Sequence, residues 1–101
     1  MTHSQRHYDE ALRKILADPV LRVFLWRIIE EDCRVFQEGF PASAMIYSLA
    51  AKQEIGKRLL ADAKMRDPEA VFKAEQEYKA LMALDRATED LEDIYIEEQG
   101  E

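Results

Sequence analysis

The sequence contains little glycine, proline or cysteine, and it has no long apolar run. Three glycines and three prolines in 101 residues are too few for the many turns of an all-β protein. The single cysteine excludes an internal disulfide and fits a reducing compartment. The most apolar run, residues 20–29, holds two arginines within ten positions, whereas a membrane span needs about 20 mostly apolar residues. We therefore expect no disulfide scaffold, no β-sheet protein and no membrane span.

Basic side chains are also scarce relative to acidic ones. The chain has 14 Lys and Arg against 21 Asp and Glu, a formal net charge of −7. A protein that binds nucleic acid by neutralising phosphates needs a basic face, so we expect no direct nucleic-acid partner. The polar N-terminal residues lack the apolar core of a secretory signal, which predicts assembly in the cytoplasm. A hydrophobic content of 48% is enough for a folded core.

Start and stop signals divide the chain into four predicted helices. Asp18-Pro19 and Asp67-Pro68 each combine a good N-cap with a proline at the first helical position. Residues 39–43 contain Gly, Pro and Ser and form the clearest loop. The helices are predicted over residues 5–17, 19–38, 44–65 and 68–98.

These helices predict an all-α fold, a small bundle of three packed helices with a long fourth. The second helix is apolar around more than half of its circumference, which places it at the centre. Gly56 lies inside the third helix, where glycine costs about 1 kcal/mol relative to alanine. Close approach of another helix compensates for such a glycine, and the second helix is the candidate for this packing.

The fourth helix is too long for the bundle to cover. At 1.5 Å per residue it would extend about 45 Å. Its first half carries an apolar stripe that includes Val71, Ala74 and Tyr78, which we expect to pack on its own domain. Its second half carries a stripe with strict 4-3-4-3 spacing, offset around the helix axis. That second stripe consists of Ala80, Leu84, Ala87, Leu91 and Ile94. We expect one domain, with a bundle over residues 1–84 and an acidic helical extension over 85–101.

Charge is divided unevenly between the two parts of the chain. Residues 1–66 hold 11 basic and 9 acidic side chains, whereas residues 67–101 hold 3 basic and 12 acidic ones. The acidic helix could be a solvated face, an arm that docks on a basic partner, or a mimic of DNA. The candidate partner-binding residues are Leu84, Ala87, Leu91, Ile94, Glu89 and Asp93.

Two arginines, Arg22 and Arg27, interrupt the apolar second helix. They would pair either within the chain, with their apolar stems lying along the core, or with the acidic arm of a neighbouring copy. The uneven charge distribution is the only feature that suggests the second alternative.

No pattern in the sequence points to catalysis, a metal or a cofactor. His3 and His7 are four residues apart near the N-terminus, where we expect both to be solvated. The carboxylates of the last helix lack the Glu-x-x-His pattern of di-iron bundles and the rhythm of a calcium loop. Cys33 lies on an apolar side and Trp26 in an apolar run, so we interpret both as core residues. No phosphate-binding glycine loop or nucleophile elbow is present. We therefore expect no enzyme, no metal and no cofactor.

Several segments together resemble a family of small tailed-phage proteins first named from a Bordetella phage reading frame. The resemblance extends over about residues 8–78. It rests on residues 8–16, 20–29, 33–36, 54–60, 67–70 and 75–78. It implies a protein encoded among virion structural genes, with no catalytic residues to carry over. It also implies a place in the particle near the portal, the tail or the ejection apparatus.

We thus expect a non-enzymatic phage virion protein that docks through its last helix and oligomerises. Its partners would be further copies and other phage structural proteins, and it would join the virion after assembly in the host cytoplasm. The alternative is an acidic regulator, outside the virion, that binds a basic host or phage protein. A DNA-packaging factor with a helix-turn-helix in the second and third helices is a weaker alternative, because the chain is acidic.

Overall fold

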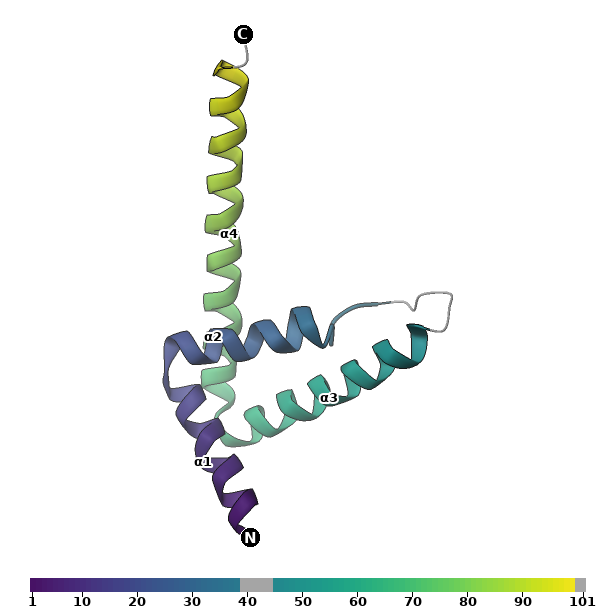
Figure 1. The fold of residues 1–101 in the computed structure, drawn as a ribbon. Helices are drawn as coiled ribbons and strands as arrows, with labels where there is room; N and C mark the ends of the chain where they lie inside the picture. The colour runs from purple at the N-terminus through teal and green to yellow at the C-terminus, as the bar shows by residue number, and fades with distance from the viewer. Residues whose placement is uncertain (39–44, 100–101) are drawn as a thin grey trace.

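A computed structural model describes residues 1–38 and 45–99. All regular secondary structure in these residues is helical, which confirms the predicted all-α fold. The elements are α1 (His3–Ala17), α2 (Pro19–Arg27), the π-helix η1 (Ile28–Asp32), α3 (Met45–Arg66) and α4 (Pro68–Gln99) (Figure 1). The loop predicted at residues 39–43 lies outside the described residues.

The helix starts follow the capping signals. Asp18 accepts hydrogen bonds from the backbone N–H groups of Val20 and Leu21, at 2.9 and 3.3 Å, and Pro19 is the first residue of α2. The Asp67 carboxylate likewise accepts from the N–H of Ala70 at 3.0 Å. These bonds satisfy N–H groups that have no partner inside the helix.

Helix α1 starts two residues before the predicted position. Thr2 and Gln5 form a reciprocal capping box, in which the Gln5 N–H donates to Thr2 Oγ1 at 3.1 Å. The Thr2 N–H in turn donates to Gln5 Oε1 at 2.8 Å. This pair extends the helix into polar residues that the apolar periodicity did not include.

The prediction of one helix over residues 19–38 is wrong beyond Asp32. The α-helix ends at Arg27 and widens into η1, where the Cys33 N–H donates to the Ile28 carbonyl at 2.8 Å. Arg34 then has a φ of 52°, a left-handed conformation that stops helical propagation. Buried Gln53 on α3 donates from Nε2 to the carbonyls of Arg34 and Gln37, at 3.0 and 3.3 Å. The turn is therefore held by a side chain from another helix.

The core lies where α2 crosses α4 and where α1 and α3 close over that crossing (Figure 1). Its buried residues are Leu12, Leu16, Leu25, Trp26, Ile29, Leu60, Ala63, Ala70, Val71, Ala74 and Tyr78.

Helix α2 contacts both α1 and α4, as a central helix should. The other helices do not cover all of its apolar surface, because Val20 and Phe24 are 77% and 61% exposed. None of the other described helices covers the side of α2 that carries these two residues. Trp26 is a core residue as predicted, and its ring stacks on Phe36 with centroids 5.5 Å apart. Phe24 and Tyr47, by contrast, are exposed.

At Gly56, α3 approaches the turn after η1 closely. A Cβ atom at this position would overlap Cys33 Cβ and Val35 Cγ2. The close approach thus involves the turn that follows η1, rather than a continuation of the second helix. Cys33 is buried there as a free cysteine, in line with its predicted role in the core.

We expect Gly56→Ala to destabilise the fold. Alanine would gain about 1 kcal/mol of helix propensity, but the added methyl would overlap Cys33 and Val35, and overpacking costs about 1–3 kcal/mol. Urea unfolding followed by circular dichroism measures the net free energy. A matched control is Ala61→Gly at an exposed site of the same helix, which isolates the propensity effect. A Gly56→Ala variant more stable than the wild type would contradict the close approach.

Candidate docking site on the C-terminal helix

Helix α4 extends well beyond the bundle that buries its first half. Among the side chains described up to Asp93, Tyr78 is the last buried one and Met82 is half-buried, whereas each residue from Ala83 to Asp93 is exposed. Figure 1 shows this part of α4 projecting away from the other helices. The helix is one uninterrupted element to Gln99. We call its part from residue 83 to 99 the arm.

An apolar stripe runs along one side of the arm and its base. Leu84 and Leu91 are 63% and 68% exposed, and Ala80 and Ala87 are exposed beside them. We call these four residues the seam. Their 4-3-4 spacing is that of the a and d positions of a coiled coil. Ile94, predicted as the next member, belongs to α4, but its side chain lies outside the described part of the chain.

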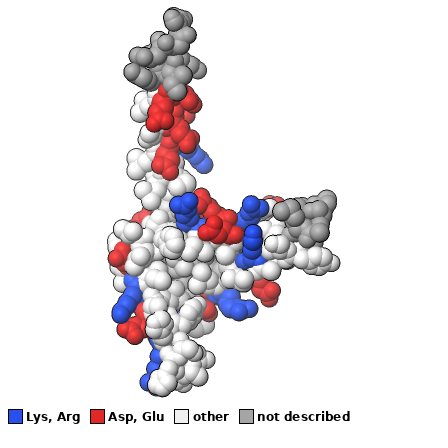
Figure 2. Space-filling view, viewed as in Figure 1, with Lys and Arg blue, Asp and Glu red and all other residues white. Residues whose placement is uncertain are grey.

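Glu89 and Asp93, the two acidic residues predicted to bind a partner, lie on a different face of the arm from the seam. With 3.6 residues per turn, Glu89 and Asp93 are about 140° and about 180° around the helix from Leu84. Figure 2 shows acidic side chains gathered over the arm. Glu89 and Asp93 therefore do not share a contact surface with Leu84, Ala87 and Leu91. One helix packed on the seam would leave Glu89 and Asp93 free for a different contact.

Two polar contacts fasten α4 to the bundle directly below the arm. Arg22 donates from Nε to Glu77 Oε1 at 2.6 Å, and Tyr78 donates from Oη to Glu31 Oε1 at 2.8 Å. Glu31 also accepts from Arg27 Nε at 2.7 Å. Arg22 and Arg27 thus pair within the chain, which is the first of the two predicted alternatives.

The contact between Tyr78 and Glu31 shifts the ionisation of both groups. Burial of the phenol, reinforced by its hydrogen bond to the carboxylate, raises the pKa of Tyr78 to about 12. The same hydrogen bond, together with the one from Arg27, lowers the pKa of Glu31. Over the neutral range, the tyrosine therefore stays a donor and the glutamate an acceptor.

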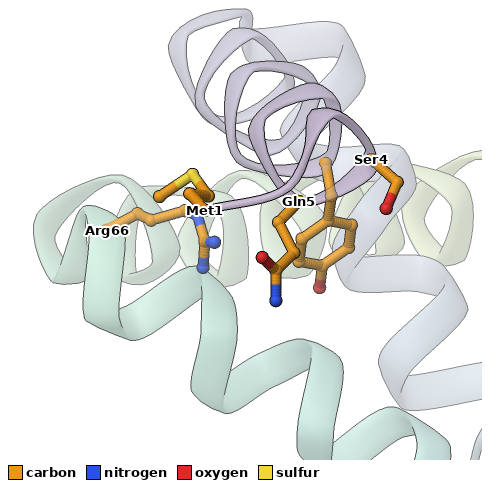
Figure 3. A pocket seen from close by; sticks show the side chains of 5 residues that line it. Met1, Ser4, Gln5 and Arg66 are labelled. Carbon is orange, nitrogen blue, oxygen red and sulfur yellow. The ribbon is translucent and has the colours of Figure 1, made fainter.

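A depression at the N-terminal end of the bundle lies where α1 meets α3. Figure 3 shows Met1, Ser4, Gln5 and Arg66 around it, and Tyr8 completes its lining. The polar groups here are already engaged within the chain. The Tyr8 hydroxyl donates to Asp62 at 2.8 Å, and Arg66 donates to Asp9 at 2.8 Å. The Arg66 guanidinium also lies 5.3 Å from the centre of the Tyr8 ring. These contacts join α1 to α3.

Two further findings concern metals and membranes. Within residues 1–38 and 45–93, no cluster of three or more His, Cys, Asp or Glu side chains could hold a metal ion. His3 and His7 are exposed on α1. None of the helices described is long and apolar enough to cross a membrane.

Comparisons with protein-family models, with curated proteins and with solved structures find no match for this chain. The resemblance to the phage family therefore rests on the sequence motifs alone.

Sequence reasoning missed how far the seam side of α4 stays open. Lys73 and Gln76 are exposed on the same side of the helix as the seam, inside the part that packs on the bundle. Lys73 is about 20° around the helix from Leu84. Lys73 lies one heptad before Ala80 and so continues the spacing of the seam, whereas Gln76 lies beside that line. Both side chains are polar, so a search for apolar residues does not find them.

We expect Tyr78→Phe to remove part of the loss of stability at alkaline pH. In the wild type, the unfolded chain releases the phenolic proton near pH 10, whereas the native chain holds it to about 12. Because the native pKa is raised, the contribution of Tyr78 is complete below pH 10 and is lost as the pH rises through 12. Urea unfolding between pH 9 and 12 measures this slope.

The control is Tyr47→Phe, which changes an exposed tyrosine. We expect that variant to keep the wild-type pH slope. Equal slopes for Tyr78→Phe and the wild type would contradict the buried contact between Tyr78 and Glu31.

Proposed function

We propose that this protein is a non-enzymatic structural or assembly component of a tailed-phage particle, and that it acts by docking and oligomerisation through its arm. The observation that carries the proposal is the exposed seam on a helix that leaves its own bundle. An apolar stripe with coiled-coil spacing has no use in the isolated chain, and a second helix would bury it.

The energetics favour a partner for the seam. Leu84 and Leu91 are both well exposed in the single chain. Burying each of them fully would contribute about 1.5–3 kcal/mol before the cost of association. A contact of this size on one helix is weak by itself, so several copies in an assembly would reinforce one another.

The phage assignment is supported by the resemblance of residues 8–78, whose most specific part is residues 54–60. That segment contains Gly56, where α3 closely approaches the turn after η1. The partners would be other phage structural proteins. Within the particle, the protein would be located near the portal, the tail or the ejection apparatus. The protein would be made in the host cytoplasm and carried in the virion.

A second function is favoured by the acidic face of the arm. Asp85, Glu89, Glu92 and Asp93 are all exposed and lie away from the seam. A protein that presents such a face could bind a basic host or phage protein outside the virion, in competition with DNA. This regulator predicts binding that weakens strongly with salt.

We expect Leu91→Asp to weaken incorporation into particles and to leave the protein folded. Leu91 is 68% exposed and contributes nothing to the core, whereas a carboxylate in a helix–helix contact would be buried without a partner. Circular dichroism measures folding, and immunoblots of purified particles measure incorporation. Glu54→Ala, at an exposed position of α3 outside the arm, is the control. Global unfolding of Leu91→Asp would contradict an independent arm.

Mass spectrometry of purified particles of the encoding phage tests the function itself. We expect the protein at a fixed number of copies per portal. A protein abundant in infected cells but absent from particles would reject the structural role and favour the acidic regulator.

A further inference from the structure

We propose that the seam of one chain packs antiparallel against the seam of a second copy. In this arrangement Leu84 lies opposite the partner's Ala87, and Leu91 lies opposite the partner's Ala80. The inference rests on the proposed docking function and specifies the partner, the direction and the register. It assigns the acidic face to a separate contact.

The alternation of residue size along the seam selects the antiparallel direction. The seam reads Ala80, Leu84, Ala87, Leu91, so each large side chain is followed by a small one. Two antiparallel copies in the proposed register place every leucine over an alanine, and the interface fills evenly. Two parallel copies would place leucine on leucine and alanine on alanine, which alternates crowded and empty layers.

Charge favours the same direction. The acid-rich end of one arm then lies beside the bundle of the partner, instead of beside the partner's own acid-rich end. In the proposed register, Glu92 is level with the partner's Lys79. The partner's exposed Lys73 is level with the last turn of the arm. A parallel pair would place like charges at the same height along the helix axis.

The seam side of α4 is exposed over most of the length that this pairing needs. Glu77, which holds the heptad position between Lys73 and Ala80, is half-buried and bonded to Arg22. Lys73, Gln76 and Ala80 are exposed next to the bundle, and Leu84, Ala87 and Leu91 are exposed beyond it. In the proposed register, two copies of α4 overlap from residue 72 to 99, about four heptads. That length is sufficient for a two-stranded coiled coil, whereas a single helix without tertiary contacts is marginal in water.

The acidic face remains accessible in this dimer. Glu89 and Asp93 point away from the contact, so no cluster of acids is buried. Asp90, at the edge of the seam, is close to the partner's Ala83 and not to another acid. The dimer thus brings two copies together without the like-charge repulsion that the net charge of −7 would otherwise cause.

A size swap along the seam tests the register. Ala87→Leu should raise the dimer dissociation constant about 10-fold, because it places leucine against the partner's Leu84. Leu84→Ala should also weaken the dimer, because it leaves alanine opposite alanine. The double variant with both changes should recover most of the wild-type affinity. Sedimentation equilibrium measures the dissociation constants, and Glu54→Ala, at an exposed position of α3 outside the seam, is the control that keeps the wild-type value.

Cysteine cross-linking tests independently whether the two α4 helices of the dimer run antiparallel or parallel. In a Cys33→Ala background, we expect a Leu84→Cys chain mixed with an Ala87→Cys chain to form a mixed disulfide quickly. We expect each of these two proteins alone to cross-link slowly. Rapid cross-linking of Leu84→Cys with itself would indicate parallel copies and would overturn the proposal.

Three further outcomes would also overturn the proposed pairing. Tighter association of Ala87→Leu would indicate a parallel pair, and a dimer insensitive to every seam variant would indicate another interface. A wild-type protein that stays monomeric at millimolar concentration would overturn self-association. If Leu91→Asp were still lost from particles in that last case, docking through the arm would stand, with a different protein as the partner.

Discussion

The crossing of α2 over α4 determines the rest of the structure. Apolar residues of both helices pack together there. Beside them, Arg22 Nε on α2 lies 2.6 Å from Glu77 Oε1 on α4. A helix that is crossed at a steep angle is covered over only a few turns. The 32 residues of α4 are many more than one crossing and two flanking helices can cover. The exposed arm is therefore a direct result of how the bundle closes, and not a separate module attached to it.

The same crossing fixes where the arm begins. Tyr78 is buried on the core side of α4 and donates to Glu31 on η1, so the last buried turn of α4 is bonded to the π-helix. The next turns meet no other element, and each residue from Ala83 to Asp93 is exposed. No glycine or proline interrupts the helix from Glu69 to Gln99, so nothing in the sequence stops it at the edge of the bundle. A partner that covered the seam would add tertiary contacts to a helix that has none there.

Local signals predicted the parts of the fold that depend on local chemistry. Asp18 with Pro19, and Asp67 with Pro68, begin helices where the sequence places them. The position of Gly56 indicated a close contact before any partner was known. The π-helix and the left-handed Arg34 could not be predicted in this way. They depend on a buried amide from Gln53, 19 residues away along the chain, which holds the Arg34 carbonyl.

The candidate site likewise has features that local sequence signals predicted and features that depend on how the helices pack. Helical spacing alone identified Leu84, Ala87 and Leu91 as one stripe, and the structure places their side chains on the surface. The pairing of Arg22 with Glu77 required knowledge of which helices cross, so the charge pattern by itself suggested the wrong partner.

The separation of seam and acidic face gives the arm two independent surfaces. A contact that used both at once would have to wrap around the helix, because Glu89 and Asp93 lie about 140° and 180° from Leu84. Two copies joined through their seams would instead expose two acidic faces, related by a two-fold axis. Each face would carry the negative charge concentrated in residues 67–101, and neither would face the other across the seam. Apolar burial would then set the pairing of copies, and charge would set the choice of a basic neighbour in a larger assembly.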